Sequence, residues 1–181
     1  SSIGSLGSLI TMDNGDVLLM GRDGSVSIGG WGIYASQDAG LSFSLRYDLG
    51  TGGRAQLWKH RTQAGVVLVL QSDQLSVSND NGHTVQSMGT AMPVSLSSPK
   101  LRASEATNPP TVYVIGKNGN DTELWRTVDG GMTWDMRRTI INYWGPCQVS
   151  ITDPDMVAWG EVDCFVTYNG GTSAHRVNNW Y

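Results

Sequence analysis

Four short runs of apolar residues recur along the chain, each bounded by the glycines, prolines and polar residues that mark turns. Continuous runs of this length are typical of strands that are buried on both faces. They recur every 40–50 residues or so, roughly the length of one unit in several repeat architectures. The four runs are residues 16–21, 65–71, 111–116 and 156–160. They predict one buried inner strand in each of four repeats.

Weaker strand patterns flank each inner strand, separated from it by turn residues. The strands predicted before the inner ones are residues 9–12, 55–58, 100–103 and 148–152. The strands predicted after them are residues 32–35, 75–77, 123–125 and 163–166. A last strand follows in each repeat. The chain is therefore predicted to be all-β, with four antiparallel sheets of about four strands each and no helix.

A polar motif follows the third strand of every repeat. It consists of a hydroxyl residue, Asp or Asn two positions on, Gly two further on, a second hydroxyl residue two beyond that, and then an apolar residue. We call these segments the first box (36–43), second box (78–85), third box (127–134) and fourth box (167–174). Their key positions are Asp38, Gly40, Asp80, Gly82, Asp129, Gly131, Trp134, Asn169 and Gly171.

The residue types of the box suit a tight hairpin turn. An Asp or Asn side chain can accept hydrogen bonds from backbone amides two residues on, and the following Gly adopts the positive φ that such a turn requires. The flanking hydroxyl groups can bind further amides, and the last apolar residue can fold back onto the sheet. Together these groups are predicted to lock a hairpin.

These segments resemble the Asp-box, or BNR repeat, of sialidase-like β-propellers, and the third box matches that pattern best. The second box ends in Val85, and the fourth contains Asn169 and ends in Ala174, so both are degenerate copies. The resemblance implies a single propeller of four four-stranded blades, at about residues 1–50, 51–92, 93–141 and 142–181. It also implies that each box lies between the third and fourth strands of its blade and has a structural role, not that of a reactive site. Because relatives generally have more than four blades, assembly of two chains or docking on a neighbour stays open.

Composition supports many tight turns between short strands. The chain has 23 Gly, only 6 Pro and 15% charged residues, which argues against a helical bundle or a disordered segment. Its formal net charge is −4, and no basic run is longer than Arg137-Arg138, so nucleic acid is not an expected partner. The longest apolar stretch is far shorter than the roughly 20 residues of a membrane helix, so no membrane insertion is expected. The first residues show no signal-peptide pattern.

The two cysteines, Cys147 and Cys164, match no metal-ligand spacing, and no metal or cofactor is expected. They fall on the predicted first and third strands of one blade, about 9–10 Å apart. A disulfide requires Cα atoms within about 7 Å. We therefore predict two free thiols.

The resemblance places any binding site at the end of the blades opposite the boxes, in the loops between second and third strands and between blades. Aromatic rings beside amides and carboxylates suit sugars, and protein interfaces use the same residue types. The predicted ligand-binding residues are Trp31, Arg54, Arg102, Asn118, Asp121, Tyr143, Trp144 and Glu161.

Catalysis is not expected. A sialidase-like site needs three arginines, a Tyr nucleophile with its Glu, and an Asp acid, and other glycosidases need paired carboxylates. The chain has three Glu and lacks the family's Arg-Ile-Pro motif. The leading hypothesis is a non-catalytic module that recognises a glycan or a protein, as part of a virion or a cell surface. The alternatives are a scaffold that assists assembly and a sialidase-like glycosidase or a fragment of one; the ligand and the organism stay open.

Overall fold

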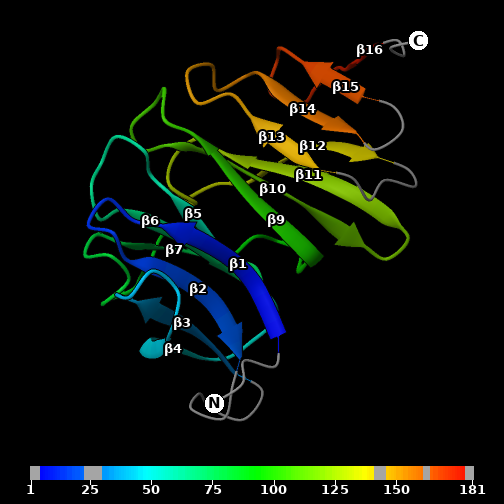
Figure 1. The fold of residues 1–181 in the computed structure, drawn as a ribbon. Coiled ribbons are helices and arrows are strands. Elements are labelled where there is room, and N and C mark those ends of the chain that lie inside the picture. The colour runs from blue at the N-terminus through cyan, green and yellow to red at the C-terminus, as the bar shows by residue number, and fades with distance from the viewer. Residues whose placement is uncertain (1–4, 23–29, 141–145, 161–163, 178–181) are drawn as a thin grey trace. The chain divides into compact units, whose positions relative to one another are not determined.

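The computed structural model describes residues 5–22, 30–140, 146–160 and 164–177. In these residues the chain forms strands and turns only, with four four-stranded antiparallel sheets (Figure 1). Each sheet is made of four consecutive strands, each paired with its neighbours in the sequence. The predicted all-β fold class is confirmed. The described part of the chain has no helix long and apolar enough to cross a membrane.

The strand bounds follow the repeat. The first sheet contains β1 (Ser5–Thr11), β2 (Val17–Arg22), β3 (Gly30–Ser36) and β4 (Ser44–Thr51). The second contains β5 (Ala55–Lys59), β6 (Val67–Gln71), β7 (Gln74–Ser78) and β8 (Gln86–Ser87). The third contains β9 (Ser97–Ser104), β10 (Thr111–Asn118), β11 (Asp121–Thr127) and β12 (Asp135–Ile140). The fourth contains β13 (Cys147–Val149), β14 (Val157–Gly160), β15 (Cys164–Thr167) and β16 (His175–Val177).

Every predicted inner strand is present, but the strand predicted at 148–152 is wrong at its end, because β13 stops at Val149. The hydroxyl oxygen of Ser150 accepts hydrogen bonds from the backbone amides of Thr152, at 3.3 Å, and Asp153, at 3.1 Å. A Ser side chain that binds the amides ahead of it favours a turn over a continued strand.

The chain divides into two compact units, residues 1–88 and 89–181, each with two sheets. We call them unit 1 and unit 2 and describe each by itself. Each unit contains two boxes, and the same kinds of contact recur in both. The single propeller domain predicted from the resemblance stays a prediction.

The inner strand β2 of unit 1 is buried on both faces, as its apolar run predicts. Leu18 and Met20 belong to one core cluster with Val67 and Val69 of the second sheet. Leu19, between them in the sequence, packs on Tyr34 in a separate cluster. Successive side chains of a strand point to opposite faces, so this alternation requires apolar residues at every position.

Unit 2 has an equivalent core between its two sheets. Tyr113 and Leu124 of the third sheet share a buried cluster with Val157 and Trp159 of the fourth. The hydroxyl group of Tyr113 donates to the carbonyl oxygen of Pro154 at 2.7 Å, which satisfies its one polar atom. Burial raises the pKa of Tyr113 to about 12.

The two cysteines lie on β13 and β15, the first and third strands of the fourth sheet. Cys147 pairs with Trp159 and Cys164 pairs with Gly160, so β14 runs between them. Both are free thiols; Cys147 is buried and Cys164 is exposed. The predicted strand placement is confirmed.

Candidate functional site

All four boxes lie on hairpins between the third and fourth strands of their sheets, as the resemblance implies. In the third box, the hydroxyl oxygen of Thr127 accepts a hydrogen bond from the amide of Gly131 at 2.8 Å and donates to Asp129 Oδ1 at 2.8 Å. Asp129 in turn accepts the amide of Thr133 at 2.9 Å and its hydroxyl group at 2.6 Å. The side chains of Thr127 and Asp129 thus each bind the backbone amide four residues further along the chain. The sequence predicted that the Asp side chain would bind an amide two residues further along.

The fourth box keeps this geometry with an amide in place of the carboxylate. Asn169 Oδ1 accepts the backbone amide of Ser173 at 2.9 Å, as Asp129 does for Thr133. Asn169 Nδ2, however, donates to the hydroxyl oxygen of Ser173 at 2.7 Å. The hydroxyl group can serve as donor or acceptor, so it accommodates either side chain.

The box carboxylates are held in their ionised form. Hydrogen bonds from Ser36 and Ser42 lower the pKa of Asp38 from 3.8 to about 2. Bonds from the hydroxyl and amide of Thr133 lower the pKa of Asp129 to the same value. For Asp80, burial is the largest single influence and raises the pKa, but bonds from Thr84 and Ser78 together lower it to about 2. These shifts suit structural acceptors, not proton donors.

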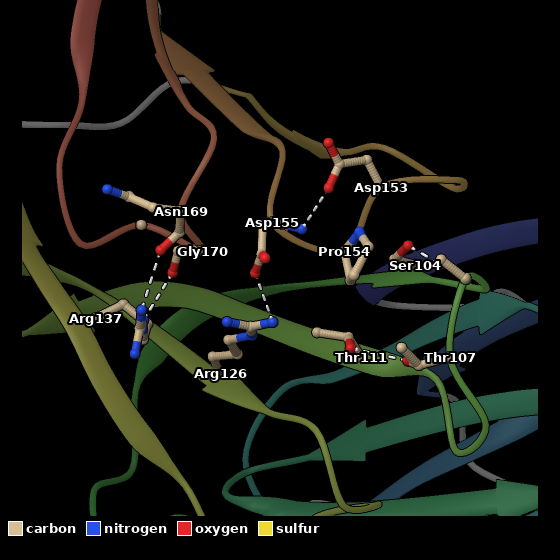
Figure 2. A network of polar contacts seen from close by, with 12 residues as sticks. Ser104, Thr107, Thr111, Arg126, Arg137, Asp153, Pro154, Asp155, Asn169 and Gly170 are labelled. Atoms are coloured by element: carbon tan, nitrogen blue, oxygen red, sulfur yellow. Dashed lines mark hydrogen bonds and ion pairs between the residues drawn. The ribbon is translucent and has the colours of Figure 1, made fainter.

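An arginine of each unit's first sheet binds the box of its second sheet. In unit 1, Arg46 Nη1 donates to the carbonyl oxygen of Asn81 at 3.0 Å. In unit 2, Arg137 Nε donates to the carbonyl oxygen of Gly170 at 2.8 Å (Figure 2). Each arginine stands eight positions after its own box Asp, and each carbonyl stands one position after the next box's Asp or Asn. The two units therefore use the same contact.

The second box is further fixed by a buried ion pair in unit 1. Arg46 Nη2 lies 2.7 Å from Asp16 Oδ2, and both side chains are less than a tenth exposed. The hydrogen bond from Arg46 lowers the pKa of Asp16 below its usual value. The charge of Arg46 is thus matched inside the protein.

At the opposite end of the third sheet, the β10–β11 hairpin brings together two of the predicted ligand-binding residues. Asn118 and Asp121 are exposed and pair across a two-residue turn that starts with Gly119, whose φ is 61°. Asn118 Nδ2 donates to Glu123 Oε1 at 3.0 Å, and Trp125 Nε1 donates to Glu123 Oε2 at 2.7 Å. Each carboxylate oxygen of Glu123 thus has a donor within the protein.

Two other predicted residues have structural roles. The loop placement of Trp31 is wrong: it lies in β3, is 3% exposed and belongs to the unit 1 core. The glycines around it, at 30 and 32, are part of that strand and not a turn. Arg102 also lies within a strand, β9, where its Nε donates to the carbonyl oxygen of Cys147 at 2.9 Å. That bond joins the two sheets of unit 2.

Arg54 stands immediately before β5, in the segment between the first and second sheets where the prediction places it, and it is exposed. Its carbonyl oxygen accepts the amide of Ser72 at 3.3 Å. The remaining predicted residues, Tyr143, Trp144 and Glu161, lie outside the described residues.

A hollow of about 570 Å³, which no sequence pattern indicates, lies at the box end of unit 1. Its lining residues come from the first box and its flanking strands, with one residue of the second box: Ala35, Gln37, Asp38, Ser42, Ser44, Leu45, Arg46 and His83. Aligning the first and third boxes on Asp38 and Asp129 would have identified Arg46 and Arg137 as equivalent residues. That alignment would not have revealed the hollow. In the described segments, no group of three or more His, Cys, Asp or Glu could hold a metal ion.

Comparison with known proteins finds structural relatives only. The GH74 xyloglucanase from Xanthomonas campestris matches with a TM-score of 0.64 and 16% sequence identity, over 97% of this chain and 31% of that chain. The Niastella koreensis GH74 enzyme matches with a TM-score of 0.59 and 17% identity, over 93% of this chain and 28% of that one. A structure of YCF48 bound to D1 peptide, at 13% identity over 94% of this chain and 66% of that one, has a TM-score of only 0.44, too low to support an argument. No protein-family model and no curated protein matches.

The fold is therefore that of β-propeller blades of the Asp-box type, related in structure to the GH74 propellers. This chain spans less than a third of the length of each GH74 chain. Identities below a fifth establish the fold alone, and membership of the sialidase-like family stays a prediction.

Proposed function

We propose that this chain is a non-catalytic β-propeller module that recognises a glycan or a protein surface through its β10–β11 hairpin. The observation that carries the proposal is the fixed array of Asn118, Glu123 and Trp125 beside the exposed Asp121. An amide and a carboxylate held at one hairpin can donate to and accept from neighbouring hydroxyl groups of a sugar or polar groups of a protein. Their positions are set before binding, which lowers the entropic cost of recognition.

The carboxylates favour binding over catalysis. A glycosidase needs two carboxyl groups at a defined separation, one of them kept protonated by a raised pKa. Glu123 instead uses both oxygens as acceptors for Asn118 and Trp125. The pKa values of Asp16, Asp38, Asp80 and Asp129 are all shifted downward, opposite to what a general acid requires.

A glycan array, followed by capture of protein partners, tests the proposal. The test variant is the double substitution N118A/D121A, and the matched control is D73A at the β6–β7 turn of unit 1. We expect the double variant to lose at least tenfold in affinity for the bound glycan or protein, with an unchanged melting temperature. Binding that survives the double variant would show that this hairpin is not the recognition site.

Glycan hydrolysis is the second candidate, favoured by the structural similarity to a GH74 xyloglucanase. A reducing-sugar assay on xyloglucan would support it if turnover exceeds the buffer rate, and it would then replace the non-catalytic proposal.

The composition, rich in glycine and poor in charge, supports a place on a virion or a cell surface. An assembly scaffold is the remaining alternative, and a protein partner captured without any glycan binding would favour it.

A further inference from the structure

The hollow at the box end of unit 1 is lined mainly by polar residues. Gln37, Ser42 and Ser44 provide amide and hydroxyl groups, and Ala35 and Leu45 are the apolar residues of the lining. Among the described residues, no side-chain hydrogen bond occupies Gln37 or Ser44. Their polar atoms are available to solvent or to a ligand. A volume of about 570 Å³ lies within the usual range for small-molecule sites.

The charged groups of the hollow already have hydrogen-bond partners inside the protein. Arg46 is paired with Asp16 and also binds the Asn81 carbonyl. Asp38 accepts hydrogen bonds from Ser36 and Ser42 on both of its carboxylate oxygens. An anion or a cation would therefore have to compete with an existing partner, whereas an uncharged ligand would not.

Unit 2 has a larger side chain than unit 1 at the position one residue before its first box. Arg126 occupies the position one residue before the third box that Ala35 occupies before the first. Its Nη2 lies 2.8 Å from Asp155 Oδ1 (Figure 2). Its guanidinium lies 5.6 Å from the ring centre of Tyr113. With alanine at the matching position, unit 1 has no such side chain, and Ala35 is one of the residues that line the hollow.

We infer that the hollow at the first box is a binding site for a neutral saccharide, separate from the β10–β11 hairpin. The amide of Gln37 and the hydroxyl groups of Ser42 and Ser44 can pair with vicinal sugar hydroxyls. The exposed imidazole of His83, from the second box, closes one side of the site. Arg46 is paired with Asp16 and the carboxylate of Asp38 is hydrogen-bonded by two serines, so neither group needs a charged ligand as its partner.

The test measures ligand binding by saturation-transfer NMR on the full chain. The probes are glucose, xylose, galactose, N-acetylglucosamine and cellobiose, with inorganic phosphate and acetate as anionic comparisons. Ser44→Tyr fills the hollow from an exposed strand end, and Asp135→Tyr is the matched control, because it stands at the same distance from the third box in unit 2. Gln37→Ala removes one polar group without adding bulk.

We expect at least one neutral sugar to bind, with a loss of tenfold or more in S44Y and a several-fold loss in Q37A. D135Y should bind that sugar as the unaltered chain does. Absence of binding by every sugar, equal binding by S44Y, or binding of phosphate alone would each overturn the inference. Loss of sugar binding in N118A/D121A but not in S44Y would also overturn it, since the sugar would then be at the hairpin.

Discussion

Arg137 Nε lies 2.8 Å from the backbone carbonyl oxygen of Gly170, so a side chain of β12 holds the turn of the fourth box. Its Nη2 also donates to the carbonyl of Asn169 at 3.1 Å and to the hydroxyl oxygen of Thr172. The same relationship between Arg46 and Asn81 in unit 1 indicates that each unit is a pair of sheets joined through a box. The predictions below follow from the boxes, this contact and the two thiols.

Removing the arginine that binds the fourth box should destabilise unit 2. We expect Arg137→Ala to lower the free energy of unfolding by about 1–3 kcal/mol, because it deletes charge-assisted hydrogen bonds to two backbone carbonyls. Thermal and urea denaturation measure the effect. Arg138→Ala is the control, since the side chain of Arg138 makes no hydrogen bond to the described residues of the fourth box. Equal effects of the two substitutions would contradict a specific role for the box contact.

The first hydroxyl residue of a box should contribute more to stability than its size suggests. Thr127 is 2% exposed, and its hydroxyl oxygen accepts the amide of Gly131. We expect Thr127→Val to lower the free energy of unfolding by about 1–3 kcal/mol, because it leaves the buried amide of Gly131 without a hydrogen-bond partner. Thr127→Ser retains the hydroxyl group and should restore most of the loss. If chemical denaturation shows that the valine variant is more stable than the serine variant, the hydroxyl group is not the stabilising element.

Acid should weaken the boxes that contain Asp. The folded-state pKa values of Asp38, Asp80 and Asp129 are about 2, below the ordinary 3.8, so the folded chain binds protons less readily than the unfolded chain. Their stabilisation is complete above pH 4 or so and is lost as the pH falls through about 2. Circular dichroism between pH 5 and pH 1.5, or thereabouts, should show this loss of stability.

A triple variant, D38N/D80N/D129N, provides the matched comparison for the acid experiment. The fourth box shows that Asn fits the same geometry, because Asn169 accepts one bond from Ser173 and donates the other. We expect the variant to fold and to unfold at a lower pH than the unaltered chain. Coincident acid transitions for the two proteins would argue against the box carboxylates as the acid-sensitive groups.

The two thiols should differ in reactivity. Burial raises the pKa of Cys147 to about 12, so almost no thiolate forms at neutral pH, whereas Cys164 is exposed. We expect a thiol-specific chromogenic reagent to modify one cysteine in the native chain and both after denaturation. Cys164→Ser should remove the native reaction. Two fast-reacting thiols in the native chain would show that the β13 region opens readily.

The strand order and the box positions could be predicted from sequence because they depend on nearby residues. An apolar run marks an inner strand, and a hydroxyl, an acid and a glycine at fixed spacing close a hairpin through bonds that span only four residues. The fourth box, with Asn169, was recognised for the same reason. Asn118 and Asp121 were correctly placed at one hairpin because their turn is local.

The contacts between sheets were decided only by the tertiary structure. Trp31 lies between glycines that resemble a turn, yet it is buried where the two sheets of unit 1 meet. Arg102 falls in the strand predicted at 100–103 and is a predicted ligand-binding residue, but its guanidinium binds a carbonyl that stands 45 residues away in the sequence.

What the amino-acid order determined by itself is thus the set of strands and the turns that close them, since both arise from interactions within a few residues. Which side chains face one another across two sheets was decided by folding. Arg46 and Asn81 lie 35 residues apart, and no local pattern records their pairing. The hollow beside Ala35 has the same origin, because its walls come from two boxes that only the packing of the sheets brings together.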